Sequence, residues 1–301
     1  LAPAKAGPAP PPLDGHAAGG HTLTQPFHRP QAPATRAPAA ARLSGFLMIR
    51  TPLITVMVQA VRKAGRALAR DFGEVEQLQV SMKGPGDFVS AADRKSEETL
   101  HAELLRVRPT YSFLMEESGA VEGADTSNVW VVDPLDGTTN FLHGIPIFSI
   151  SLALVRNGVP VAGVIFNPVM DELYVAETGQ GAYLNDRRLR VAGRKKLADS
   201  VVCCGLPHMG RGDHAKFNRE LEKVQGQVSG LRRTGSAAID LAWVASGRFD
   251  AFWERDLSAW DMAAGIVLVR EAGGIVTDLS DGDKMLDKGS VIAGNEIIRS
   301  D

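Results

Sequence analysis

The sequence predicts a mixed α/β (α+β) fold in which layers of helix alternate with layers of sheet. From Ile54 onward, apolar residues recur at alternating intervals of four and three, which is the spacing of an amphipathic helix. Further along, two apolar runs are joined by Asn157-Gly158, a strong signal for a β-hairpin. Helical patterns and groups of strands then alternate to the end of the chain, which indicates stacked layers.

Each element has a local signal in the sequence. The first helix covers 54–72, and the second follows Ser90-Ala-Ala-Asp93, a helix-start signature, and runs to about Arg106. The region of 83–86 between them is expected to be a loop. The remaining expected elements are strands over 113–115, 129–132, 148–156, 159–167, 172–176, 181–184, 249–253, 275–278 and 291–293, and helices over 215–224, 236–246 and 260–271.

Composition is that of an ordinary globular protein, with 44% hydrophobic and 23% charged residues among 301. The net charge of −2 gives no reason to expect nucleic acid or an anionic membrane as the main partner. No stretch approaches the roughly 20 apolar residues that span a bilayer. The only cysteines, Cys203 and Cys204, are adjacent and form a poor disulfide pair, so we expect a cytoplasmic protein.

Residues 1–47 differ in composition from the rest. They are rich in Ala and Pro, hold more than half of the 17 prolines and carry a net charge of +3. Nothing in this segment can form a core, so we expect a disordered extension that is not part of the native protein, with a genuine tail as the alternative. The folded domain is expected over 48–301.

The most informative segment runs from Trp130 to Phe141. An apolar strand is expected to stop at Asp133, turn through Pro134 and offer Asp136 three residues later, before Gly137. The carboxyl end of a buried strand is where open α/β sheets place their ligands. Two hard oxygen donors suit magnesium, and the amides that follow suit a phosphate. The segment therefore predicts metal-assisted phosphoryl chemistry.

Other carboxylates end separate apolar segments, namely Glu116, Glu254 and Asp261. Magnesium takes six oxygen ligands, so carboxylates from several elements must converge to bind it. Each carboxylate alone is better explained as a solvated strand end or a helix cap than as a site residue. Thr138 and Asp93 are open in the same way: Thr138 could orient a water or cap a turn, and the residues alone favour a cap for Asp93.

Other patterns give no site. Asp278-Leu-Ser-Asp-Gly-Asp283 looks calcium-like but lacks the rest of an EF-hand loop, so we expect a turn. His208 and His214 have no partner at a zinc spacing. The chain has neither a P-loop nor a dinucleotide-binding glycine motif, which disfavours nucleotide-cofactor chemistry.

Several motifs together resemble the inositol monophosphatase family. The resemblance rests on Asp133-Pro-Leu-Asp-Gly-Thr-Thr-Asn-Phe141, on Trp260-Asp-Met-Ala-Ala-Gly265 with Glu271-Ala-Gly-Gly274, and on Met115-Glu-Glu-Ser-Gly119, where Met115 replaces the usual Gly. A stretch from Lys83 to Asp93 also matches, so the resemblance spans about 48–301. It implies a five-layered α-β-α-β-α sandwich of the inositol monophosphatase and fructose-1,6-bisphosphatase type.

Residue by residue, the resemblance implies a division of roles. Glu116, Asp133 and the Leu135 carbonyl would bind a first magnesium ion, and Asp133, Asp136 and Asp261 a second, with Glu116 also near a third. The catalytic residues would be Thr138, Asp93 and Glu116, with Thr138 and Asp93 activating the attacking water, which overturns the cap preferred for Asp93 above. Substrate contacts would come from Asp136, Gly137, Thr138, Gly235, Ser236, Ala237, Glu254 and Asp261.

The implied activity is magnesium-dependent hydrolysis of a phosphate monoester, foremost myo-inositol 1-phosphate, by a homodimer that lithium inhibits. Two alternatives stay open. One is a broader sugar phosphatase acting on fructose 1,6-bisphosphate, histidinol phosphate or a nucleotide 3′-phosphate. The other is a non-catalytic regulatory partner of the RNA polymerase and ribosomal RNA machinery. Few basic clusters are evident in the sequence, so we expect no direct binding of nucleic acid and no membrane partner.

Overall fold

The computed structural model divides the chain into two units, Leu1–Ser44 and Gly45–Asp301. It describes residues 50–74, 80–84, 87–207 and 212–300, with the backbone alone for 80–84 and 87–90. The extension expected over 1–47 therefore lies outside the described residues, and the following account concerns the second unit. Within the described residues, no helix is long and apolar enough to cross a membrane.

The second unit begins with a helical layer on an eight-stranded sheet. Helices α1 (Pro52–Phe72) and α2 (Ala91–Val107) pack against each other and against β5 to β7. The sheet has the strand order β10-β9-β8-β7-β6-β5-β3-β4, antiparallel except for the β3–β5 pair. Its strands are β3 (Tyr111–Met115), β4 (Gly119–Val121), β5 (Asp125–Asp136), β6 (Ser149–Arg156), β7 (Val159–Asn167), β8 (Glu172–Glu177), β9 (Gly181–Leu184) and β10 (Arg187–Arg188).

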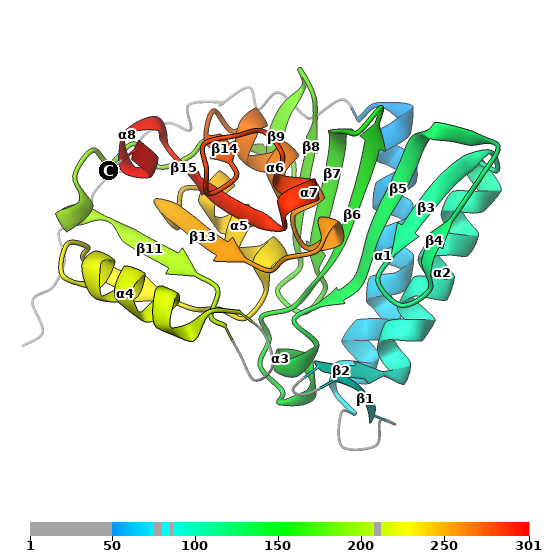
Figure 1. Cartoon of the computed structure of the whole chain (residues 1–301). Coiled ribbons are helices and arrows are strands. Elements are labelled where there is room, and N and C mark those ends of the chain that lie inside the picture. The colour runs from blue at the N-terminus through cyan, green and yellow to red at the C-terminus, as the bar shows by residue number, and fades with distance from the viewer. Residues whose placement is uncertain (1–49, 75–79, 85–86, 208–211, 301) are drawn as a thin grey trace, which may run out of the picture. The chain divides into compact units, whose positions relative to one another are not determined.

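Helices α5 (Ala237–Ala245) and α6 (Ala259–Glu271) form the middle layer, since both contact strands of each large sheet. The second sheet has the order β12-β11-β13-β15-β14. Its strands are β11 (Val201–Cys204), β12 (Gly230–Arg232), β13 (Ala251–Arg255), β14 (Ile275–Thr277) and β15 (Ser290–Gly294). Helices α4 (His214–Gln225) and α8 (Glu296–Ser300) lie on its outer side (Figure 1). The predicted five-layered α-β-α-β-α sandwich is confirmed.

Helix α6 is enclosed along its centre. All eight residues from Met262 to Val269 are buried, as expected for a helix with sheets on both sides. On its β7 side, a Cβ at Gly163 would lie 2.5 Å from the carbonyl oxygen of Ala264. The glycine therefore lets the helix backbone approach the strand directly.

Most predicted elements are confirmed, including the hairpin at Asn157-Gly158, where both residues have positive φ. Three expectations are wrong. Strand β5 continues through Asp136, β13 includes Glu254, and Lys83 and Gly84, expected in a loop, belong to β1 (Val80–Gly84), which pairs with β2 (Asp87–Ser90), while 85–86 lie outside the described residues. Sequence patterns also missed the short strands β4, β10, β11 and β12, the 3-10 turn Leu197–Asp199 and the short helices α3 (Thr138–Leu142), α7 (Met285–Lys288) and α8.

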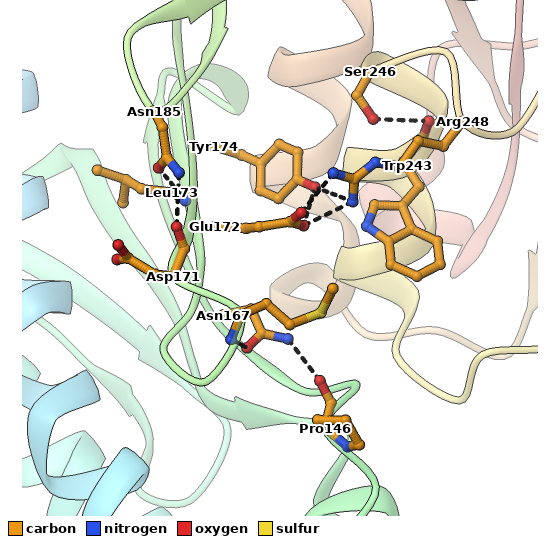
Figure 2. A network of polar contacts seen from close by, with 11 residues as sticks. Pro146, Asn167, Asp171, Glu172, Leu173, Tyr174, Asn185, Trp243, Ser246 and Arg248 are labelled. Carbon is orange, nitrogen blue, oxygen red and sulfur yellow. Dashed lines mark hydrogen bonds and ion pairs between the residues drawn. The ribbon is translucent and has the colours of Figure 1, made fainter. Parts of the chain in front are cut away.

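A polar network ties the eight-stranded sheet to the turn after α5 (Figure 2). Arg248 donates to Glu172 on β8 from both terminal nitrogens, at 2.8 Å from Nη1, while the Tyr174 hydroxyl donates to the same carboxylate at 2.6 Å. Arg248 also lies over the Trp243 ring, 5.3 Å from its centroid. Hydrogen bonds from Arg248 and Tyr174 lower the pKa of Glu172 despite its partial burial.

Candidate active site

The site is built on a β-bulge in β5. Asp133 pairs with Ser151 of β6, and Asp136 pairs with Ser149, so three steps along β5 match two along β6. Side chains three apart on a regular strand face opposite sides, and one extra residue returns them to the same side. Pro134 lies in the irregular part, where the ladder needs no N–H from it. The bulge therefore brings the two carboxylates together.

Both carboxylates are buried and accept hydrogen bonds from the backbone. Asp133 accepts the Leu135 N–H at 2.9 Å, and Asp136 accepts the Ala238 N–H at 2.9 Å. Burial, followed by the negative charges of Glu116 and other nearby carboxylates, raises the pKa of Asp133 well above its usual range. Burial raises the pKa of Asp136 to about 6, although hydrogen bonds from Ser236 and Ala238 act in the opposite direction.

Glu116 joins this pair from the end of the neighbouring strand. It follows β3, and its N–H donates to the Val132 carbonyl at 3.1 Å. Because β3 runs parallel to β5, both strands end at the same edge of the sheet. Its carboxylate is close enough to Asp133 to raise that residue's pKa by charge and by hydrogen bonding.

Thr138 lies directly after the bulge and faces α2. Its hydroxyl is 3.0 Å from Asp93 Oδ1 and 3.0 Å from the Leu135 carbonyl oxygen. A hydroxyl has one proton, so it donates to one of the two oxygens at a time. Gly137 before it has φ of +91°, a conformation that favours glycine. The structure brings Thr138 and Asp93 together across 45 residues of sequence.

Two further carboxylates lie in the same region: Asp261 on α6 of the middle layer and Glu254 on β13 of the second sheet. Asp261 lies in the first turn of α6 and accepts the Ser258 N–H at 2.7 Å, so it also caps its helix. Both residues line a pocket of about 90 Å³ that is bounded on another side by α4. Burial and the charges of Asp240, Asp261 and Asp136 raise the pKa of Glu254 well above its usual range.

The stretch Gly235-Ser236-Ala237 meets the bulge from the start of α5. The buried Ser236 hydroxyl donates to Asp136 Oδ2. Ser236 would therefore act on a ligand indirectly, by positioning the Asp136 carboxylate. Gly235 has φ of +88° and leaves space for Asn140, whose side chain donates to the Thr234 carbonyl at 2.8 Å. Asn140 thereby connects the segment that follows the bulge to the loop before α5.

Sequence patterns missed Asp240, a fully buried carboxyl behind this loop. It accepts the Thr234 hydroxyl at 2.6 Å, and burial raises its pKa to about 7 despite this bond and one from Cys203. In sequence, Asp240 is a single acidic residue in an apolar helix, and its place in the first turn of α5 explains it as a helix-start charge. Its closeness to Asp136 depends on how α5 packs, so no local pattern reveals it.

The remaining candidates lie elsewhere. Asp278 accepts N–H groups of its own turn and the Lys288 ammonium, which with its other hydrogen bonds lowers its pKa to about 2, so the calcium-like segment is a turn as predicted. His208 lies outside the described residues. His214 begins α4 on the surface. Both cysteines are free thiols, and burial raises their pKa values.

The donor set suits magnesium by its chemistry. Within the described ranges, no three or more Asp, Glu, His or Cys side chains are arranged as they stand to hold a metal ion. Glu116, Asp133, Asp136 and the Leu135 carbonyl nevertheless supply only oxygen donors, which magnesium prefers. The crowded negative charge that raises the pKa of Asp133 is also what a divalent cation offsets.

Comparison with known proteins identifies the family. Residues 49–300 match the model of the inositol monophosphatase family. The chain belongs to this family. The match includes β5 with its bulge, α2 and α6, so the inositol monophosphatase family fold accounts for every element that carries a candidate residue.

Individual inositol monophosphatase family members resemble the chain over most of their length. Inositol-1-monophosphatase of Mesorhizobium japonicum is 65% identical over 252 residues, which cover 84% of this chain and 95% of that protein. Nus factor SuhB of Pseudomonas aeruginosa is 42% identical over 81% of this chain and 92% of its own. The crystal structure of extragenic suppressor protein suhB from Bartonella henselae has a TM-score of 0.81 and 56% identity, covering 83% and 96%. The chain is accordingly an enzyme of the phosphatase class.

Proposed function

We propose that the chain hydrolyses myo-inositol 1-phosphate to inositol and phosphate in a magnesium-dependent reaction. The observation that carries the proposal is the bulge of β5. It places the buried carboxylates of Asp133 and Asp136 close to Thr138, whose hydroxyl is hydrogen-bonded to the carboxylate of Asp93. The name of the Mesorhizobium relative supports inositol 1-phosphate as the substrate. Lithium is expected to inhibit the reaction, as the family resemblance implies.

Two or three magnesium ions would be held by side chains already described. Glu116, Asp133 and the Leu135 carbonyl would hold the first, Asp133, Asp136 and Asp261 the second, and Glu116 would contribute to a third. When bound, magnesium supplies charge stabilisation for the phosphoryl group and makes a water more acidic. The carboxylates of the chain fix where that charge is placed.

The chain's own residues handle the proton and the substrate. Because the Thr138 hydroxyl can donate to Asp93, its oxygen can accept a proton from the attacking water while its own proton passes to the Asp93 carboxylate. The amides of Gly137 and Thr138 would bind the phosphate, and Glu254 with the loop at Gly235-Ser236-Ala237 would orient the inositol hydroxyls. Asp261 and Asp136 would contribute both to the contacts with the phosphate and to those with the inositol hydroxyls.

Substitution of the bulge carboxylates tests this function. We expect Asp133→Asn and Asp136→Asn to abolish magnesium-dependent phosphatase activity and to keep the circular dichroism spectrum, because each removes a charged oxygen ligand with almost no change in volume. Asp287→Asn, an exposed residue of α7, is the matched control and should retain full activity. Full activity in either bulge variant would refute the metal assignment. Rates on inositol 1-phosphate, fructose 1,6-bisphosphate and histidinol phosphate would identify the substrate.

The Pseudomonas relative, named a Nus factor, favours a second candidate, a regulatory partner of the transcription machinery. Such a role does not need the carboxylates of the bulge. The Asp133→Asn protein should then still be retained by purified RNA polymerase in a pull-down, with loss of retention counting against it. The cytoplasmic location expected from the sequence stays a prediction.

We further propose a homodimer formed through an apolar patch made of Ile145, Val169 and Met170. All three side chains are more than a third exposed although large and apolar. Asn167 holds their loops together: its amide donates to the Pro146 carbonyl at 2.9 Å, and its oxygen accepts the N–H groups of Val169 and Met170 (Figure 2). A patch on fixed loops is suited to a permanent partner.

A further inference from the structure

One turn of α2 contacts both segments that carry candidate metal ligands. Asp93, Ser96 and Glu97 are spaced i, i+3 and i+4, so their side chains project from the same face of the helix. All three are buried, at 0%, 1% and 3% exposure. Buried polar side chains at this spacing require partners on whatever packs against the face.

The first two residues of this face bind the bulge of β5. Asp93 accepts the Thr138 hydroxyl at 3.0 Å, and the Ser96 hydroxyl donates to the Pro134 carbonyl oxygen at 2.9 Å. Pro134 lies between Asp133 and Asp136, where the β5–β6 pairing is irregular. The helix thereby stabilises the part of the bulge that the ladder leaves unpaired.

The third residue binds the other ligand-bearing segment. Glu97 accepts the Glu117 N–H at 2.8 Å with Oε2, and its Oε1 accepts the Ser118 hydroxyl. These are the two residues that follow Glu116 at the end of β3. The turn formed by residues 116–118 connects β3 to β4, which pair again from Met115 and Gly119, and Glu97 holds this turn from the side of α2.

We propose that Glu97 is a positioning residue for magnesium, and that this rests on the function proposed above. By holding the Glu116–Ser118 turn on the same helical face that holds the bulge, it sets the distance between Glu116 and the pair Asp133 and Asp136. Ligands held in place before binding lose less conformational entropy when the ion arrives, and outer residues that orient ligands change metal affinity about tenfold to a hundredfold in other proteins.

Three variants separate geometry from charge. Glu97→Ala removes both hydrogen bonds, whereas Glu97→Gln keeps an oxygen for the Glu117 N–H but loses the negative charge. Glu98→Gln makes the same charge change on the exposed face of α2 and is the control. Magnesium binding to the metal-free enzyme without substrate is measured by isothermal titration calorimetry, with urea unfolding and kcat at saturating magnesium measured in parallel.

We expect Glu97→Ala to raise the Kd for magnesium about tenfold or more, with kcat at saturating magnesium changed much less. Glu97→Gln should shift the Kd by clearly less, and Glu98→Gln should not shift it. Amide hydrogen exchange at Glu117 should be faster in metal-free Glu97→Ala.

Two results would overturn the proposal. One is an unchanged Kd in folded Glu97→Ala, including the case in which only its stability falls, since this shows a purely structural role. The other is an equal shift in Glu97→Gln and Glu97→Ala, since charge rather than position would then be responsible. If Glu97→Ala does not fold, Glu97→Asp decides, because it keeps the charge and draws both oxygens back from Glu117 and Ser118; a Kd equal to that of Glu98→Gln would then refute the proposal. Absence of magnesium binding by the wild-type enzyme would instead refute the proposed function.

Discussion

Single buried polar residues connect the loops of the site to its helices. Asp240 shows this most clearly, because its carboxyl binds the Thr234 hydroxyl while the Thr234 carbonyl accepts from Asn140. Asn140 in turn donates to the Ile147 carbonyl at 2.7 Å. One carboxyl of α5 is thus connected through Thr234 and Asn140 to the loop that follows the bulge. The neighbouring titratable groups are Cys203, Cys204, Asp136, Arg233 and Glu254.

The raised pKa of Asp240 makes stability depend on pH. Its folded pKa of about 7 exceeds the ordinary 3.8, so between these values the folded state binds a proton that the unfolded state lacks. Stability therefore falls as pH rises from about 4 to 7, by about 1.4 kcal/mol for each unit of pKa difference. Asp240→Asn removes this dependence, and the asparagine oxygen can still accept the hydrogen bond from the Thr234 hydroxyl.

Urea unfolding of metal-free protein at pH 5 and pH 8 measures the effect. The wild-type protein should lose more stability between the two pH values than Asp240→Asn does. Asp287→Asn should follow the wild-type curve, since this residue is exposed. Parallel curves for wild type and Asp240→Asn would show that Asp240 does not titrate in this range.

Sequence patterns located most of the site residues but not how they are connected. Asp133, Asp136 and Thr138 follow an apolar run, so their position at a strand end could be predicted. The bulge that places Asp133 and Asp136 on one side could not, because it is defined by the register against β6. For Asp93 the residues alone favour a helix cap, and its hydrogen bond with Thr138 appears only in the folded structure.

At the scale of elements, glycine sets how closely the layers approach. Gly163 allows β7 to contact the backbone of α6, and a Cβ at Gly265 would lie 2.4 Å from Leu241 Cδ1 on α5. Helix α6 is therefore packed tightly on both its strand and its helix neighbour. Since α6 begins near Asp261, this packing also fixes the position of that carboxylate.

Substitution of Gly163 by alanine should destabilise the fold. The added methyl group would meet backbone atoms of Ala264, which cannot rotate away, so we expect a loss of about 1–3 kcal/mol in the free energy of unfolding. Gly193→Ala is the matched control, because no atom lies within 4 Å of the position that its added Cβ would take, and its φ is not in the left-handed region. Urea denaturation of both variants measures the difference, and equal stabilities would contradict the close approach.

Long periodic elements were predictable, whereas short ones were not. Helices α1 and α6 and the β6–β7 hairpin have repeated local signals over many residues. Strand β11 has four residues, two of them cysteines, and forms only because β12 and β13 pair with it on both sides. The second sheet could therefore be expected in part, but this strand depends on tertiary pairing.

At the scale of the whole folded unit, the proposed dimer accounts for exposed apolar surface that the five layers leave uncovered. Ile145, Val169 and Met170 lie on loops that Asn167 connects by hydrogen bonds to Pro146, Val169 and Met170. Figure 2 shows Asn167 and Pro146 together with Glu172, Tyr174 and Arg248 of the polar network. That network fixes β8 against the turn after α5, so the surface near the patch has a defined shape. A defined apolar surface favours association of identical chains.

A charge placed in the patch should break the dimer. We expect Met170→Glu to shift the protein from dimer to monomer in sedimentation velocity, because association would bury the new carboxylate. Val121→Glu, at 42% exposure against 41% for Met170, introduces the same charge on β4 away from the patch and should stay dimeric. A monomeric wild-type protein, or a dimeric Met170→Glu, would show that the patch is not the interface.

The pocket shared by Glu254 and Asp261 has a consequence for how the family can diversify. The groups that would act on the phosphate lie on the first sheet and the two layers around it, held by a bulge and by tight glycine contacts. The opposite wall of the pocket comes from α4 and the loop at Leu206, which belong with the second sheet. If the pocket takes the alcohol as proposed, exchanging Leu206 or Lys216 is expected to alter which alcohol is accepted and to leave the phosphate chemistry unchanged, so that new substrates need no change in the catalytic residues.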